Sequence, residues 1–214
     1  MSTSLTRRLT LLRGCLLPVL LAGCAVGQQT RFYTLATTTE PTAVARPENG
    51  LVIGLGPVTL PQYLDRPDIV TRQGANQMRL PDIYRWAEPL QPLMTRILAE
   101  DLYALLNAND VVPLPQRGDI RLDRAIEVDV GRFDATEAGE VTLDARWRIY
   151  GGDEQTLITS GRSILTEAGA PVPDYDAIVA AMSRAVGRLS QEIAAAIGGP
   201  APVPAPAPRR ARRT

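Results

Sequence analysis

The stretch Val141-Thr142-Leu143-Asp144-Ala145-Arg146-Trp147-Arg148-Ile149 decides the fold. Its five odd-numbered residues are apolar, and its four even-numbered residues are polar or charged. Because successive side chains of a strand point to opposite faces of a sheet, this alternation predicts a strand with one buried and one water-facing side. The sheet that contains it therefore needs a cover on one face only.

Two weaker alternations flank this strand. Residues 126–130 alternate Ile and Val with acidic residues, and residues 156–166 alternate less regularly. The intervening turns, at 137–140 and 151–154, are short and contain glycine, which is typical of hairpin connections. The three segments therefore predict an antiparallel meander.

Two helices are predicted from apolar residues at three- and four-residue spacing. The first covers residues 88–107, with Pro89 near its start, and the second covers 175–197. Asp174 is placed to cap the second helix, and Gly198-Gly199 to end it. A one-sided sheet with two amphipathic helices predicts an α+β, two-layer domain, in which both helices pack on one face of an antiparallel, meander-containing sheet.

The remainder of the predicted domain, residues 31–199, is less regular. We expect a short strand at 31–35, a loop at 36–50, and a buried strand at 51–60 that begins apolar on both faces. A proline-bounded connector at 61–67 leads to a small hairpin, with strands at 68–71 and 76–80.

The N-terminus has the pattern of a bacterial lipoprotein signal. Arg7, Arg8 and Arg13 precede a short apolar segment that closes with Leu21-Ala22-Gly23-Cys24. The segment is far shorter than the roughly 20 apolar residues of a spanning helix. We therefore expect a signal peptide at 1–23 and an acylated tether at 24–30 that begins at Cys24. The alternative is an ordinary cleaved signal in which this cysteine is incidental.

The C-terminal segment 200–214 is a Pro/Ala-rich stretch followed by an arginine-rich tip. Such a sequence favours extended polyproline II and acts as a semi-rigid spacer. Two interpretations stay open. The tip attaches to anionic lipid, lipopolysaccharide or cell wall, or the segment is a disordered solubilising tail.

Composition excludes several kinds of chemistry. The chain has no histidine, which removes Ser-His-Asp and Cys-His catalysis and nearly all zinc sites, and no cofactor is indicated. After signal removal Cys24 is the sole cysteine, so no internal disulfide can form. Three of the 23 arginines lie in the signal and four in the tail, leaving 16 against 23 acids, a net charge near −7. That balance argues against nucleic acid as a partner.

Five residues are candidates for a binding surface. Tyr63 and Arg66 lie in the proline-bounded connector, and Tyr84, Arg85 and Trp86 lie just before the first helix. These residue types are enriched at protein–protein hot spots. The structural alternative is that Trp86 covers the core at the start of the helix and Tyr63 packs under its loop. Both interpretations stay open, and no catalytic or metal-binding residue is proposed.

Three segments carry a family resemblance. They are Tyr33-x-Leu35, the block 56–72 (GPVTLPQYLDRPDIVTR), and Arg85-Trp86-Ala87-Glu88-Pro89-Leu90. Together they resemble the PqiC (YmbA-like) family of ABC-type transport auxiliary lipoproteins, over about residues 31–197. The resemblance implies a non-enzymatic subunit of a lipid transport system. The proline-arginine tail is not part of the family pattern.

The resemblance also implies location and partners. Such a protein is anchored through Cys24 in the outer membrane, faces the periplasm and forms a homo-oligomeric ring. It meets an MCE-domain (mammalian cell entry, PqiB-like) protein of an inner-membrane transport complex. Ala25, directly after the acylated cysteine, resembles an outer-membrane sorting signal.

Two other functions remain as alternatives. A periplasmic lipid carrier would need a continuous apolar cavity between the helices and the sheet. A carboxylate-based cell-wall enzyme needs no histidine. The chain has two adjacent acid pairs, Glu100-Asp101 and Asp153-Glu154, and the first is expected on the water-facing side of the first helix. Nothing in the sequence marks a pair across a cleft.

Overall fold

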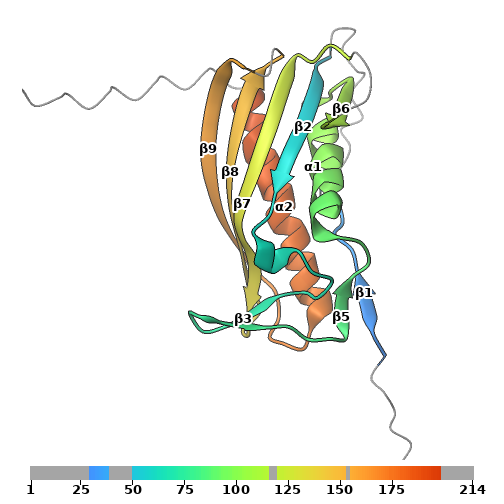
Figure 1. Ribbon diagram of the computed structural model, residues 1–214, viewed down its shortest axis with the longest axis vertical. Helices are drawn as coiled ribbons and strands as arrows, with labels where there is room; N and C mark the ends of the chain where they lie inside the picture. The colour runs from blue at the N-terminus through green and yellow to red at the C-terminus, as the bar shows by residue number, and fades with distance from the viewer. Residues whose placement is uncertain (1–28, 39–49, 116–119, 153–154, 199–214) are drawn as a thin grey trace, which may run out of the picture.

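The computed structural model describes residues 29–38, 50–115, 120–152 and 155–198 (Figure 1). It contains a curled sheet and two helices, with a small separate two-stranded sheet. In chain order the elements are β1 (Arg31–Tyr33), β2 (Val52–Thr59), the 3-10 helix η1 (Gln62–Leu64), β3 (Thr71–Gln73), β4 (Gln77–Arg79), β5 (Tyr84–Trp86), α1 (Leu90–Leu106), β6 (Asp110–Pro113), β7 (Arg124–Thr136), β8 (Glu140–Gly151), β9 (Leu157–Ala168) and α2 (Tyr175–Gly198).

The predicted meander is confirmed. Strands β7, β8 and β9 pair antiparallel along most of their length, and all five apolar residues of the 141–149 stretch are buried. In β7 the register shifts between Val130 and Arg132. This bulge moves the buried face from even-numbered residues such as Val128 to odd-numbered ones such as Phe133. The strand therefore extends six residues beyond the alternation seen at 126–130.

The α+β class is confirmed. The sheet is mixed, however, so the prediction of an antiparallel sheet is wrong for the strands outside the meander. Strand β2 runs parallel to both β6 and β7, and β3 runs parallel to β7. The reason is connectivity, because α1 lies between β2 and β6 in the chain and such a crossover returns the next strand in the same direction. The apolar character of both faces of β2 is typical of an interior parallel strand.

Both helices begin and end close to the predicted residues. Asp174 accepts a hydrogen bond from the backbone N–H of Ala177 (3.0 Å), as expected of an N-terminal cap. Helix α1 ends where Asn107 adopts a left-handed conformation (φ 48°), a common way for a helix to stop. Local sequence therefore determines where these helices start and stop.

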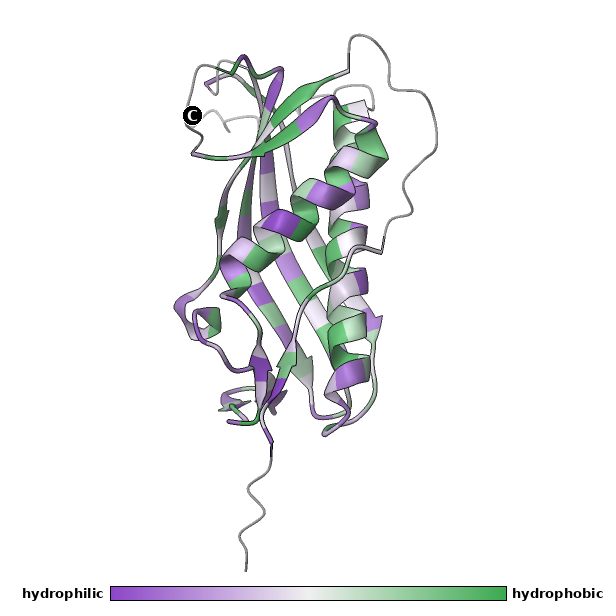
Figure 2. Ribbon diagram, turned by 90° about the vertical axis from the view of Figure 1, so that its right-hand side faces the viewer, coloured by the Kyte–Doolittle hydropathy of each residue, from purple (hydrophilic) through white to green (hydrophobic). Residues whose placement is uncertain are grey.

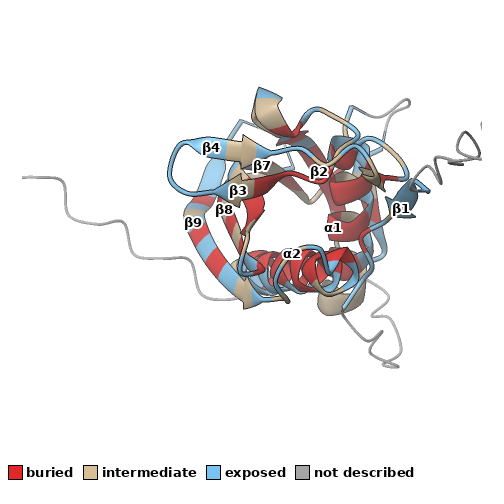
Figure 3. Ribbon diagram, turned by 90° about the horizontal axis from the view of Figure 1, so that it is seen from below, coloured by how far each residue is buried: buried red, intermediate tan, exposed pale blue. Residues whose placement is uncertain are grey.

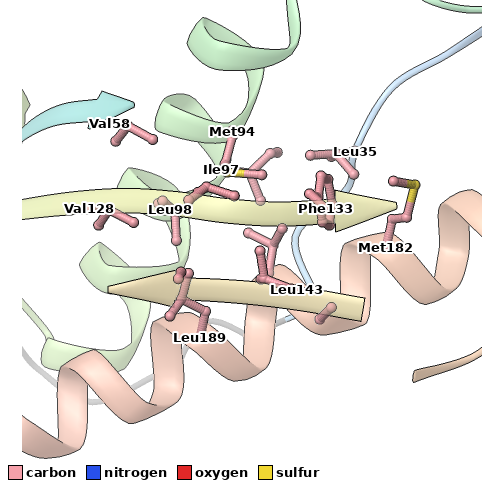
Figure 4. Packing of buried hydrophobic residues seen from close by; sticks show 14 of the residues in the cluster. Leu35, Val58, Met94, Ile97, Leu98, Val128, Phe133, Leu143, Met182 and Leu189 are labelled. Atoms are coloured by element: carbon pink, nitrogen blue, oxygen red, sulfur yellow. The ribbon is translucent and has the colours of Figure 1, made fainter. Parts of the chain in front are cut away.

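Both helices cover the same, concave face of the sheet (Figures 2 and 3). Figure 4 shows apolar side chains from both layers meeting in this space. Phe133 and Leu143 on the sheet, and Ile97 and Leu189 on the helices, are at most 1% exposed. Burying each such side chain contributes about 1.5–3 kcal/mol, so this layer is the main source of stability.

A surface ion-pair cluster joins α2 to β9. Glu167 accepts hydrogen bonds from Arg188 (2.9 Å) and Arg184 (3.1 Å). These bonds lower the pKa of Glu167 below its ordinary value, and the bond from Arg188 has the largest effect. A carboxyl group with a lowered pKa in the folded state adds stability above its unfolded pKa, and this contribution is lost as the pH falls through the folded pKa.

We predict that Glu167→Gln lowers the free energy of unfolding by about 0.5–1 kcal/mol at neutral pH, because both arginines are half exposed and solvent screens the pairs. The difference from wild type should shrink as the pH falls below about 4, where the wild-type carboxylate also becomes protonated. Urea denaturation of the variant and the wild type, at neutral pH and below about pH 4, measures this difference. A difference that persists unchanged at low pH would show that packing, not charge, is responsible.

Candidate functional site

Strand β5 brings two distant parts of the chain together. On one edge it pairs in parallel with β1. On the other edge the Trp86 N–H donates to the Pro67 carbonyl (2.7 Å), and the Ile69 N–H donates to the Tyr84 carbonyl (3.0 Å). The two sequence blocks of the family resemblance therefore lie side by side, next to the strand that follows the predicted tether.

A cavity of about 370 Å³ opens where these blocks meet. It is lined by Asp65, Arg66, Pro67, Trp86, Ala87, Glu88 and Pro89. Trp86 is 4% exposed and belongs to the core, so it forms an apolar wall. The Nε atom of Arg66 is buried and has no hydrogen-bond partner among the described residues. The cavity thus combines an aromatic wall, a guanidinium Nε without a hydrogen-bond partner, and the acidic side chains of Asp65 and Glu88.

Tyr63 has a structural role. Its hydroxyl lies 3.2 Å from Oδ2 of Asp134 and accepts the N–H of Phe133 (3.4 Å). Asp134 is fully buried and also pairs with Arg72 (3.0 Å) and Arg132 (2.9 Å). Burial, and then the charge of Asp134, raises the pKa of Tyr63, so its hydroxyl stays protonated and donates to the carboxylate. This network fastens the loop that carries Arg66 to β7.

Tyr84 and Arg85 point to opposite faces of β5, as neighbours on a strand do. The Tyr84 ring stacks on Tyr175 at the start of α2, with centroids 3.9 Å apart and an interplanar angle of 17°. Arg85 faces outward, where its Nε donates to the Asp82 carbonyl (2.9 Å) and lies 3.5 Å from Asp68 Oδ1. Neither residue lines the cavity.

Of the five predicted binding residues, the structure therefore brings only Arg66 and Trp86 into one cavity. The sequence analysis missed the other lining residues, Asp65, Pro67, Ala87, Glu88 and Pro89. They lie next to the predicted residues in the two family-like blocks, and that adjacency was the available signal. The sequence did not predict strand β5, because a strand of three residues is too short to show the alternation of buried and exposed side chains.

The adjacent acids of α1 have different environments. Glu100 is exposed and lies 3.3 Å from Arg96, whereas Asp101 is fully buried and lies 3.2 Å from the Ser190 hydroxyl of α2. The prediction that both face water is therefore wrong for Asp101, which sits where the two helices meet. Its burial leaves the pair unable to act together on a substrate.

Within the described ranges, no three His, Cys, Asp or Glu side chains are grouped so as to hold a metal ion. No helix in that part of the chain is long and apolar enough to cross a bilayer. Cys24, Ala25 and the tail 200–214 lie outside the described residues, so the predicted acylation site has no structural description.

A comparison of the sequence with known families supports the resemblance carried by the segments at 33–35, 56–72 and 85–90. A model of the ABC-type transport auxiliary lipoprotein component matches residues 33–194. The chain belongs to this family, which serves ABC transport systems and is not a catalytic one. No curated protein matches the chain.

Two solved structures share the fold. An uncharacterised protein is 19% identical, with a TM-score of 0.65, and the match covers 79% of this chain and 99% of the other. A protein from Xanthomonas campestris is 17% identical, with a TM-score of 0.64 and coverage of 77% and 93%. At these identities the likeness concerns the fold alone.

We predict that Asp134→Asn costs about 3–5 kcal/mol of unfolding free energy, because it leaves Arg72 and Arg132 without their buried counter-charge. The matched control is Asp144→Asn, which breaks a more exposed pair with Arg162 on neighbouring strands and should cost about 1 kcal/mol or less. Urea denaturation followed by tryptophan fluorescence measures both. Equal costs for the two variants would contradict a special role of the buried network.

Trp86→Ala should cost about 3–5 kcal/mol, since it empties a buried site at the edge of the core. Arg66→Ala should change the unfolding free energy by no more than about 0.5 kcal/mol, because its side chain makes no ion pair with the described residues. Thermal and urea denaturation of the two variants distinguish these outcomes. A stable Trp86→Ala variant would mean that this side chain serves binding more than packing.

Proposed function

We propose that this protein is an outer-membrane-anchored periplasmic lipoprotein that acts as a docking subunit of an MCE-type ABC lipid transport system, with a role in membrane integrity. Family membership supplies the transport system and the lipoprotein class. The proposal adds acylation of Cys24, the outer membrane as its location, a homo-oligomeric ring and an MCE-domain partner.

The observation that carries the docking role is the cavity between Arg66 and Trp86. Trp86 forms an aromatic wall, and the Arg66 guanidinium beside it has an Nε without a hydrogen-bond partner. Trp and Arg are two of the residue types that dominate protein–protein hot spots. Asp134 and Tyr63 hold the loop in place, so little conformational freedom is lost when a partner binds. A hydrogen-bond acceptor beside an apolar side chain on the partner fits this combination.

The packing favours docking over carriage of lipid. A carrier needs an open apolar space between the sheet and the helices, and this is where Ile97, Leu143 and Leu189 meet (Figure 4). All three side chains are at most 1% exposed. In this proposal the transport system as a whole moves the lipid, and no lipid is enclosed within this domain.

The edge strand β9 supports self-association. Within the described sheet it pairs with β8 alone, so its other edge is open, and it exposes Ile164 (61%) and Leu157 (52%). Open edges bearing apolar side chains are surfaces on which further chains add. A ring of identical subunits would cover this edge.

The proposal predicts that Arg66→Ala weakens binding of the MCE-domain partner at least tenfold, or about 1.4 kcal/mol. The matched control is Arg146→Ala on β8, which removes an exposed arginine that does not line the cavity. The lipidated proteins are compared by affinity purification and by titration with the purified MCE-domain protein.

If Arg66→Ala binds the MCE-domain protein as tightly as Arg146→Ala does, the cavity is not part of the interface. Failure of the wild-type protein to recover any MCE-domain protein, even after mild cross-linking, would contradict the docking role itself. Retention of phospholipid by the purified protein in native mass spectrometry would instead favour the carrier alternative.

A further inference from the structure

The end of the molecule that carries β1 exposes apolar side chains next to arginines. Phe32 is 66% exposed, the largest exposed fraction among the large apolar side chains of the described residues, and the exposed Arg31 precedes it. The pattern repeats at Leu80, which is 40% exposed and follows the exposed Arg79. Such pairs suit a membrane interface, where the apolar group enters and the arginine reaches the headgroups.

The structure holds the two pairs on one end. The Arg31 N–H donates to the Ile83 carbonyl (2.7 Å), so the start of β1 lies beside the segment that links Leu80 to β5. Figure 1 shows β1, β5 and β3 together at the lower end of the molecule. Asp82 adds one exposed acid to this segment.

The orientation of Phe32 follows from the strand. Tyr33 turns toward Tyr84, with ring centroids 6.3 Å apart, on the side that packs against α2. Because neighbouring side chains alternate, Phe32 points the other way, where its register partner is the outward-facing Arg85. The described part of the domain leaves most of this side chain open to solvent.

The length of the tether places this end near the bilayer. Four residues lie between Cys24 and Gln29, the first described residue, so the chain takes five steps from one to the other. A fully extended chain spans at most about 3.6 Å per step, or about 18 Å in all. An anchor at Cys24 therefore holds β1 within reach of the headgroups. The far end of the domain, where β9 begins and α2 ends, lies roughly 35 Å away along α2.

We propose that the Arg31–Phe32 and Arg79–Leu80 pairs form a second contact with the membrane that holds the anchor, with Phe32 entering the interface. The partner is the lipid surface. The contact fixes the domain with its β1 end against the bilayer and the end of α2 away from it. This inference rests on the proposed acylation of Cys24, but it does not depend on the docking partner.

Site-directed spin labelling of the full lipidated protein tests it. With Cys24 acylated, Phe32→Cys provides a single free thiol, and Leu157→Cys is the matched control because it is also an exposed apolar residue but lies at the other end. The labelled proteins are reconstituted in vesicles of phosphatidylethanolamine and phosphatidylglycerol. At position 32 the ratio of oxygen to water-soluble nickel-complex accessibility should be several-fold higher than at position 157.

Equal ratios at both positions, in protein that floats with the vesicles, would overturn the membrane contact and leave the anchor intact. Protein that does not float would refute acylation of Cys24 and this inference with it. Neither outcome bears on the Arg66–Trp86 cavity, because the vesicles contain no partner protein.

Discussion

The whole structure depends on covering one apolar face. Strands β7, β8 and β9 bury alternate residues on the concave side of the sheet, and no single helix is wide enough to shield them. Helices α1 and α2 share this task and therefore pack against each other as well as against the sheet. The bulge at Val130 keeps the buried face continuous while the sheet curls around the helices (Figure 3).

That arrangement gives the domain two ends with different character. At one end β1 and β5 form a small parallel sheet, next to the residue at which the predicted tether enters. At the other, α2 ends at Gly198, far from β1 (Figure 1). An asymmetric domain of this kind suits the proposed role, in which one end meets a membrane and other surfaces meet proteins.

The buried polar groups lie where loops or helices must be fixed relative to the sheet. Asp134 joins Tyr63 of the loop at 61–67 to arginines of β3 and β7, and Asp101 joins α1 to α2. Buried charges are costly unless paired, so such residues tolerate few alternative arrangements. The Asp134 network holds the loop of Arg66 in one place, which a binding cavity requires.

The sequence by itself determined the meander, both helices and their ends, because these follow from periodicity and capping within a few neighbouring residues. It also indicated the family through three short segments. Only the tertiary structure decided the parallel pairing of β2, the existence of β5, the burial of Asp101, and the separation of Arg66 and Trp86 from Tyr63, Tyr84 and Arg85. Those features arise from contacts between residues far apart in the chain, and no local pattern encodes them.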